Sequence, residues 1–249
     1  MINDILEKAK TMPGDVAVWY MDLETGREAA YNADMPLIAA SVIKLFIMAE
    51  AFRAMEAGEV CRDAEFVKTG EMNMPSCGAL NYMHDGLKVT LIDLVTLMII
   101  LSDNTATNML IDYLGMDKIN AAIERIGAQG CVLSRRLFDS EASRRGVQNY
   151  ITAAGVGRFF RMLHEGKVVS ESASREMLEI LKNQRLNGKI PFFLNCSIAH
   201  KTGEDSGITH DAGIVYAKRP FILVMLSNNT DVPVYERFMQ DAARDLAGC

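Results

Sequence analysis

The sequence of 249 residues lacks the clustered positive charge that usually marks a nucleic-acid-binding protein. Lys and Arg number 26 against 32 Asp and Glu, the formal net charge is -6, and no run of five like charges occurs. A nucleic-acid partner normally requires a basic face, so this balance argues against one. The remaining composition, 49% hydrophobic and 23% charged, is that of a folded globular chain long enough for a sizeable core.

Long hydrophobic runs are also lacking. The most apolar stretch, residues 94–101, is too short to cross a bilayer. Residues 1–10 lack the basic region and apolar core of a secretory signal. We therefore expect no membrane partner, and a cytoplasmic location for the sequence as it stands, or a periplasmic or secreted one if a signal has been removed.

Metal-binding patterns are absent too. The cysteines are odd in number and form no Cys-x-x-Cys pair, so we expect reduced, buried thiols rather than a disulfide framework or a zinc site. They are Cys61, Cys77, Cys131, Cys196 and Cys249. The four histidines show no metal-ligand spacing, so we expect no metal and no cofactor, and only His200 is expected to face a cleft.

Hydrophobic periodicity predicts strands, then helices, then strands again. A helix over residues 2–9 precedes the breaker Met12-Pro13-Gly14, and a hairpin follows. Helices are expected next, the second of them capped by Thr90 with Asp93. The predicted hairpin spans residues 16–31. The predicted helices span residues 45–52, 91–101, 106–113, 116–126, 152–164 and 172–182. Strands at 208–216 and 221–226 and a helix at 234–246 close the chain.

This order predicts an α+β fold. We expect one antiparallel sheet with packed N- and C-terminal helices, plus an inserted helical lobe. The sheet domain would be discontinuous, comprising residues 1–38 and 184–249, and the helical domain would comprise residues 39–183. A cleft between two such parts is a natural position for a site.

Ser41-Val42-Ile43-Lys44 is the first candidate for chemistry. A serine hydroxyl is a poor nucleophile without a base, and residues three apart share a helix face, so Lys44 could serve Ser41. The same residues also fit a helix N-cap followed by a surface lysine. However, Lys44 lies within an apolar run, and no second Ser-x-x-Lys occurs in the chain.

Two further triplets are candidates. In Ser102-Asp103-Asn104 the Ser102 hydroxyl could move a proton and the Asn104 amide could hold a carbonyl, although the triplet also fits a helix cap. In Lys201-Thr202-Gly203 a cation and a hydroxyl could bind a carboxylate. The triplet Lys-Thr-Gly also occurs at 68–70, but only the later copy lies in a strand context.

Taken together and in order, the three motifs resemble the signature of class A β-lactamases and penicillin-binding proteins. The resemblance covers most of the chain. It includes the hairpin at 15–32, the segment Ala39-Ala-Ser-Val-Ile-Lys, the flanks of Ser102-Asp-Asn, the preceding residues 78–86, and His210-Asp-Ala-Gly-Ile-Val-Tyr.

The resemblance implies a serine hydrolase. Ser41 would attack a lactam carbonyl and form an acyl-enzyme, with Lys44 accepting or relaying its proton. Ser102 would pass a proton to the leaving nitrogen, and Asn104 would hold the substrate amide. Lys201, Thr202 and Gly203 would form the site for the substrate carboxylate. The backbone N–H groups of Ser41 and Glu204 would form the oxyanion hole.

The sequence also departs from the family pattern. Class A β-lactamases carry a deacylating glutamate with an asparagine four residues later. The best candidate here, Glu141, is followed at that distance by Arg145, and Asn149 comes eight residues on. No arginine stands beside the third motif, which leaves Arg185 and Arg237 as candidates to bind the carboxylate. Glu204 is an unusual residue for a pocket that receives anionic β-lactams.

Three interpretations remain open at this stage. The chain would open β-lactams through a Ser41 acyl-enzyme, or it would be a penicillin-binding-protein-like D-Ala peptidase or esterase with slow β-lactam deacylation. A catalytically idle binding or regulatory domain is the third. In the first two cases we expect a monomer that acts on a small-molecule β-lactam or related acyl substrate.

Overall fold

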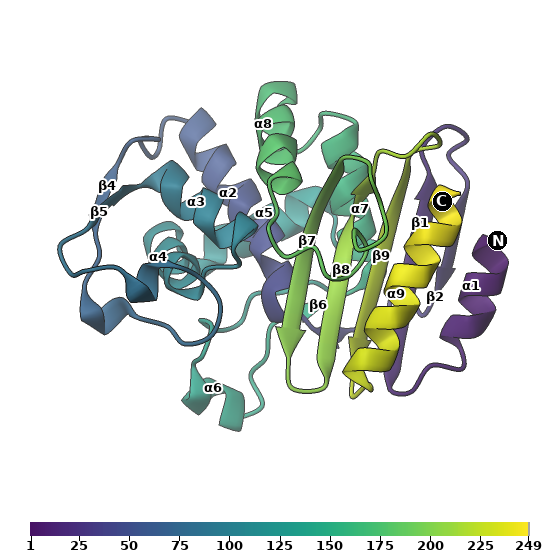
Figure 1. Cartoon of the computed structure of the whole chain (residues 1–249). Coiled ribbons are helices and arrows are strands. Elements are labelled where there is room, and N and C mark those ends of the chain that lie inside the picture. Colours follow the sequence, from purple (N-terminus) through teal and green to yellow (C-terminus); the bar gives the residue numbers. More distant parts are fainter. Residues whose placement is uncertain (249) are drawn as a thin grey trace.

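The five-stranded antiparallel sheet at the centre of the fold joins the two ends of the chain. The computed structural model describes residues 1–248. Strand order is β2-β1-β9-β8-β7, so the β1–β2 hairpin pairs with β9 and β7 forms one edge (Figure 1). The strands are β1 (Asp15–Asp22), β2 (Glu28–Tyr31), β7 (Ile198–Asp205), β8 (Ile208–Val215) and β9 (Phe221–Asn228).

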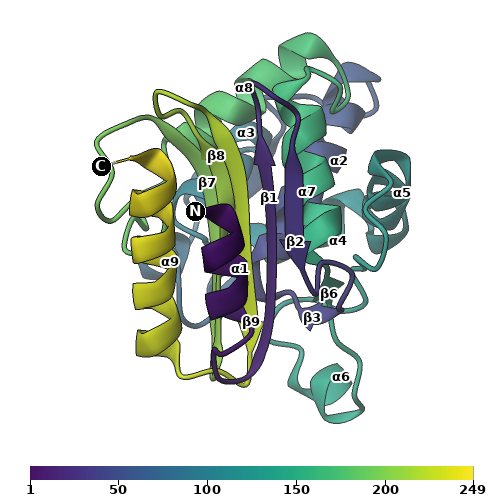
Figure 2. The ribbon, with the colours of Figure 1, turned by 90° about the vertical axis from the view of Figure 1, so that its right-hand side faces the viewer.

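Helices cover both faces of this sheet (Figure 2). The outer face packs against α1 (Ile2–Ala9) and α9 (Val232–Ala247), where Val18 and Leu223 meet Tyr235. The inner face packs against α7 (Ala153–His164) and carries Trp19. Because both faces are covered, every residue of β8 and β9 is buried, which explains why β9 reads as an apolar run from Phe221 to Leu226.

The remaining helices form a lobe beside the inner face. They are α2 (Lys44–Glu56), α3 (Leu91–Ile100), α4 (Asn104–Leu114), α5 (Met116–Ile126), α6 (Ser140–Arg144) and α8 (Glu171–Lys182). The short elements are η1 (Ala40–Ile43), η2 (Gly70–Met72), η3 (Leu80–Tyr82), and two ladders, β3 (Leu37–Ile38) with β6 (Tyr150–Ile151) and β4 (Glu65–Val67) with β5 (Lys88–Thr90). Among residues 1–248, no helix is long and apolar enough to span a membrane.

The predicted α+β architecture is confirmed, and most predicted elements lie within two residues of the observed ones. The Thr90–Asp93 capping box is present at the start of α3. The expectation that strand character returns only at residue 208 was wrong, because β7 begins at Ile198. The division into residues 1–38 with 184–249 and residues 39–183 stays a prediction, since one apolar cluster joins the helical lobe to the inner face of the sheet.

The cysteines are less buried than expected. Cys131 is buried, whereas Cys61 is exposed and Cys77 is half-buried. Burial raises the pKa of the Cys131 thiol to about 11. Cys249 lies outside the described residues. Within residues 1–248, no group of three His, Cys, Asp or Glu side chains is placed to hold a metal ion.

Gly157 lets α7 pack directly on the sheet, since an added Cβ would lie 2.4 Å from the Trp19 ring. We expect Gly157→Ala to lower the free energy of unfolding by about 1–3 kcal/mol, because overpacking outweighs the better helix propensity of alanine. Urea unfolding measures the change. At Gly188, where a Cβ meets nothing within 4 Å, the same substitution should change it by less than about 0.5 kcal/mol. A Gly157→Ala protein as stable as the wild type would contradict this packing.

Candidate active site

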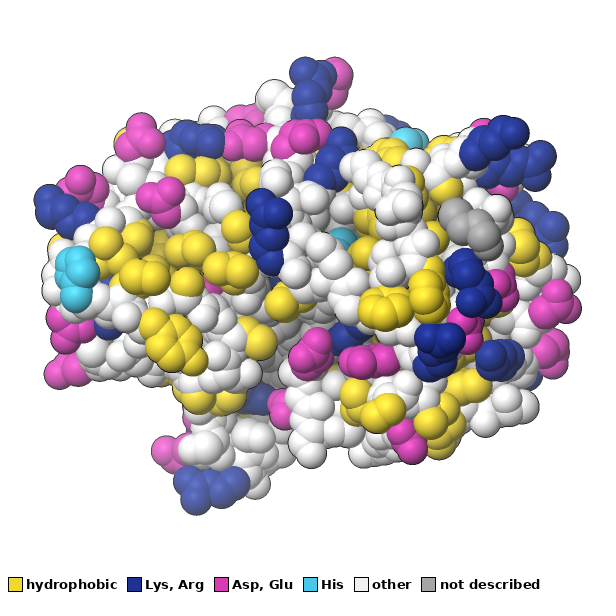
Figure 3. Space-filling view, in the orientation of Figure 1, with side chains coloured by type: hydrophobic (Ala, Val, Ile, Leu, Met, Phe, Trp, Pro, Cys, Tyr) yellow, Lys and Arg dark blue, Asp and Glu magenta, His cyan; other side chains and the backbone are white. Residues whose placement is uncertain are grey.

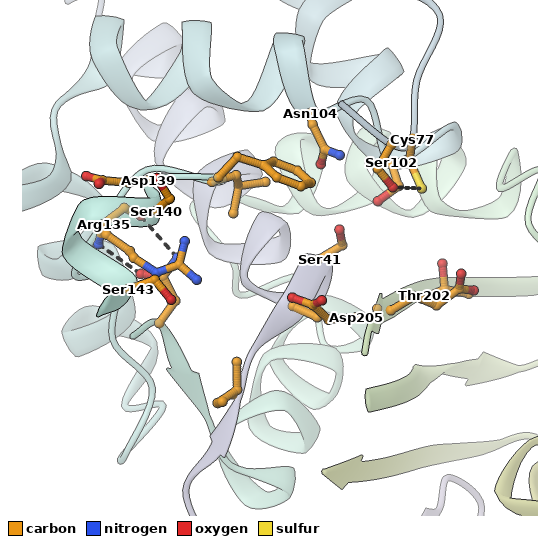
Figure 4. A pocket seen from close by; sticks show the side chains of 18 of the residues that line it. Ser41, Cys77, Ser102, Asn104, Arg135, Asp139, Ser140, Ser143, Thr202 and Asp205 are labelled. Atoms are coloured by element: carbon orange, nitrogen blue, oxygen red, sulfur yellow. Dashed lines mark hydrogen bonds between the residues drawn. The ribbon is translucent and has the colours of Figure 1, made fainter. Parts of the chain in front are cut away.

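A cavity of about 290 Å³ lies between the helical lobe and the edge strand β7. Figure 3 shows a hollow on this face above the protruding α6, with charged side chains at its rim. Its walls include Ser41, Ser102, Asn104, Thr202, Gly203 and Glu204. The three sequence motifs, which are about 60 and 100 residues apart, therefore meet in one place (Figure 4).

Ser41 lies in η1, immediately before α2 begins at Lys44. The helix start predicted near Ser41 is thus a short 3-10 turn leading into the helix. The Ser41 side chain lines the cavity and is half-buried, and among the described residues its hydroxyl has no hydrogen-bond partner. Ala40 before it has φ 42°, a left-handed conformation that only tight surroundings maintain in a non-glycine residue.

Lys44 is fully buried and its ammonium group faces the second motif. Its Nζ donates hydrogen bonds to Ser102 O at 2.8 Å, Ser102 Oγ at 3.0 Å and Asn104 Oδ1 at 2.8 Å. Burial lowers the pKa of Lys44 well below its usual range, and the nearby charge of Lys201 lowers it further. A lysine that loses its proton more readily is suited to accept one from a neighbouring hydroxyl.

Lys201 reaches the same hydroxyl from β7. Its Nζ donates to Ser102 Oγ at 3.1 Å and to Thr202 O at 2.9 Å. Burial lowers the pKa of Lys201 to about 7, although the carboxylate of Asp211 opposes the shift. The Ser102 oxygen thus lies between two ammonium groups that belong to the helical lobe and to the sheet. Its hydroxyl is placed to pass a proton between them and a substrate.

Asp103 fixes the second motif in place. Its Oδ1 caps α4 by accepting from Ala106 N at 2.9 Å, and its Oδ2 accepts from Ala79 N at 2.7 Å and Leu80 N at 2.8 Å. A Cβ at Gly78 would lie 2.4 Å from the Asp103 carboxyl carbon, so only glycine allows this approach. The cap interpretation of the triplet is therefore true of Asp103, while Ser102 and Asn104 face the cavity.

The edge position of β7 orients its backbone donors. Tyr216 N donates to Ser197 O, so odd-numbered residues of β7 are hydrogen-bonded to β8, and Thr202 and Glu204 turn their N–H groups to the open edge. The inner face at Gly203 abuts η1, since a Cβ there would lie 3.1 Å from Val42. The Glu204 N–H therefore points toward the side of the cavity on which Ser41 lies.

The sequence prediction placed several residues near the cavity that lie elsewhere. Glu141 is 75% exposed and pairs at 3.5 Å with Arg145 instead of lining the cavity. Neither Arg185 nor Arg237 lines it. His200, expected to face the cleft, does not: it is buried on the outer side, with Nδ1 2.9 Å from Asp211 Oδ1 and Nε2 3.0 Å from Asn187 Oδ1. The earlier Lys-Thr-Gly copy is structural, because Lys68 binds Met83 O and Asp85.

One wall comes from residues 134–149, in which the sequence analysis singled out Glu141 and missed the residues that line the cavity: Arg135, Leu137, Phe138, Asp139, Ser140, Ser143 and Asn149. Two buried asparagines hold this loop. Asn108 exchanges two hydrogen bonds with the backbone of Leu137, and Asn149 binds the backbone of Ser134 and Arg135. Asn108, an amide within the helix predicted at residues 106–113, was the available signal, since an amide that a helix buries must find partners.

Comparison with known proteins agrees with this geometry. The solved structure of a β-lactamase from Sphaerobacter thermophilus superposes with a TM-score of 0.90 at 28% identity, covering 99% of this chain and 97% of that one. The penicillin-binding protein PBP-A, at 24% identity and a TM-score of 0.88, shares the fold. The β-lactamase CTX-M-8 of Citrobacter amalonaticus is 26% identical over 89% of this chain and 80% of that protein. A β-lactamase of Streptomyces fradiae is 27% identical over 96% and 82%.

The fold and the three motifs define a serine hydrolase of the class A β-lactamase type. The model of the Beta-lactamase enzyme family matches residues 1–248, and the chain belongs to that family.

The pKa of Lys201 predicts an alkaline limit to activity. With a pKa of about 7, Lys201 is charged at lower pH, where we expect it to attract a substrate carboxylate, and neutral at higher pH. We therefore expect kcat/KM for a carboxylate-bearing β-lactam to fall with an apparent pKa near 7. Lys201→Arg, which stays charged, should remove this fall even if it lowers the rate. A wild-type profile that is flat from pH 6 to pH 9 would contradict the assignment.

Proposed function

We propose that the protein opens β-lactam rings by acylation of Ser41. The observation that carries this proposal is the chain of contacts Lys44–Ser102–Lys201, whose central residue Ser102 lines the same cavity as Ser41. In its deprotonated form, which burial favours, Lys44 accepts the Ser41 proton as the serine oxygen bonds to the lactam carbonyl carbon. The proton then passes through Ser102 Oγ, 3.0 Å from Lys44, to the lactam nitrogen as the C–N bond breaks.

The substrate contacts follow from the same walls. Thr202 and Lys201 bind the substrate carboxylate. Gly203, which has no side chain, lets β7 lie close to η1. Asn104 donates one amide hydrogen to Pro75 O at 3.0 Å, which leaves its second hydrogen for a substrate carbonyl. The N–H groups of Ser41 and Glu204 receive the developing oxyanion, and each such donor typically contributes about 3 kcal/mol to the transition state.

Incubation with benzylpenicillin tests this function directly. We expect intact mass to increase by the mass of one penicillin on Ser41, with loss of free drug, and Ser41→Ala to abolish both because the nucleophile is gone. Wild-type protein that neither gains mass nor consumes drug would contradict the proposal. So would an unchanged rate of drug loss in the Ser41→Ala variant.

The position of Glu141 favours a second candidate, a D-Ala peptidase or esterase that releases β-lactam products slowly. Release of the acyl group needs a base that holds a water beside the ester. Glu141 is largely exposed and outside the cavity. Asp139 is the carboxylate of residues 134–149 that lines the cavity, and its Oδ1 caps α6 by accepting from Ala142 N at 2.9 Å. We propose that whatever deacylation occurs uses Asp139.

A pair of variants separates the two carboxylates. Asp139→Asn keeps a good helix cap and removes the charge, so we expect it to slow decay of the penicilloyl adduct by about 100-fold, as the loss of a general base does. Glu141→Gln should change this decay by less than about twofold, because an exposed surface residue contributes little. Decay is followed by intact mass after removal of free drug. The reverse pattern would restore Glu141 as the base.

A further inference from the structure

Lys189 is a buried cation directly behind the third motif. It lies in the connection between α8 and β7 and is 3% exposed. Its Nζ donates to Gly203 O and His210 O, both at 3.2 Å, so two of the three ammonium hydrogens are used on the backbone. The Glu204 Oε1 lies 3.0 Å from the same nitrogen, and Glu236 Oε1 lies 3.8 Å away.

The Glu204 carboxylate is the accessible member of this cluster. Its side chain is 55% exposed and contributes to the cavity wall, whereas Lys189 lies behind the strand. Glu236 Oε1 already accepts a hydrogen bond from Thr209 Oγ1 at 2.9 Å. Glu204 is thus the ion-pair partner of Lys189 that lies where a substrate can reach it.

Thr202 shows where a substrate group would enter. It is 2% exposed and lines the cavity, and within residues 1–248 its hydroxyl has no hydrogen-bond partner. Side chains of alternate residues share a strand face, so the Thr202 and Glu204 side chains lie on the same face of β7. A group bound at Thr202 therefore meets the Glu204 carboxylate.

Two carboxylates at this end of the cavity, Glu204 and Asp205, weaken the attraction of Lys201 for an anionic group. Lys201 is shared with Ser102 and the Thr202 carbonyl, Lys189 is paired with Glu204, and the exposed Asp205 adds a second negative charge to the wall. A carboxylate at Thr202 would compete with Glu204 for Lys189 and face like charges while doing so. An ester or amide carbonyl in the same position would meet no such repulsion.

We propose that the Glu204–Lys189 ion pair is a specificity determinant that favours acyl donors whose group beside Thr202 is uncharged over donors that carry a carboxylate there. This inference rests on the proposed function, because it assumes that the acylated Ser41 and Thr202 bind one substrate. The pair makes an ester or amide the preferred class of substrate. Of two acyl donors with the same intrinsic reactivity, the one with a free carboxylate beside Thr202 would then acylate Ser41 more slowly than its ester.

The test compares benzylpenicillin with its methyl ester, which differ by one charge next to the lactam ring. The second-order rate constant of Ser41 acylation is measured for both by intact mass. The acid-to-ester ratio is the rate constant for benzylpenicillin divided by that for its methyl ester. The intrinsic reactivities of the two compounds do not depend on the protein, so a change in this ratio between variants reports the effect of the substitution. We expect Glu204→Gln, which keeps the shape of the side chain, to raise this ratio about tenfold, which corresponds to one close charge contact.

Asp205→Asn is the matched control. It removes the same charge one residue further along the wall, without a contact to Lys189. We expect it to raise the acid-to-ester ratio by less than about twofold, since exposed charges are screened. Lys189→Met should lower the ratio, because Glu204 then loses its partner. Thermal melts check that each variant is folded. Because the Glu204 side chain is half-exposed, Glu204→Gln should fold, and its ratio can be measured even if Lys189→Met does not fold.

The outcomes separate the two proposals. Acylation of the wild type with an unchanged ratio in Glu204→Gln would overturn the specificity role and leave the proposed function intact. An equal rise in Asp205→Asn would also overturn it, because the general field of the wall would then explain the effect. Wild-type protein that is acylated by neither compound would overturn the proposed function, and the inference with it.

Discussion

The hydroxyl of Ser102 is the contact on which the rest of the site depends. Two buried ammonium groups, from Lys44 on α2 and Lys201 on β7, lie 3.0 and 3.1 Å from its oxygen. Burial lowers the pKa of both lysines, and the charge of a second lysine lowers each further: Lys201 acts on Lys44, and Lys189 acts on Lys201. The carbonyl oxygens of Ser102, Thr202 and Asn104 compensate part of that cost. A single oxygen atom therefore joins the helical lobe to the sheet and contacts both ammonium groups at once.

Holding Ser102 in this position strains the backbone. Of the seven non-glycine residues with positive φ among those described, four line the cavity: Ala40, Ser76, Ser102 and Phe138. Each such conformation costs on the order of 1–3 kcal/mol and persists only where its surroundings enforce it. Asp103 enforces it at Ser102 through three backbone N–H groups, and the Asn108 pair with Leu137 does so beside Phe138. Backbone strain is thus concentrated in the walls of the cavity that contains Ser41 and Ser102.

The sequence predicted the parts of the site that depend on local spacing. Ser41 and Lys44 are three apart, and Ser102 and Asn104 follow a capped helix, so their relative positions are nearly set by the chain itself. β7 was missed as a strand because Lys-Thr-Gly-Glu-Asp breaks the apolar pattern, and only its pairing with β8 makes it one. The orientation of Glu141 could not be predicted either, because α6 has five residues and long-range bonds from Asn108 and Asn149 aim the loop that carries it.

The edge strand β7 performs three tasks because its groups point in three directions. Lys201 turns inward to Ser102, and the N–H of Glu204 faces the open edge beside Ser41. The side chains of His200 and Glu204 turn outward. These outer side chains bind Asn187 and Lys189, and Asp211 accepts from Ile190 N at 3.0 Å, all in the connection between α8 and β7. The position of the Glu204 N–H is therefore set from behind β7 by a connection of which only Leu186 lines the cavity. Changes in that connection should alter reactivity without touching any residue that meets the substrate.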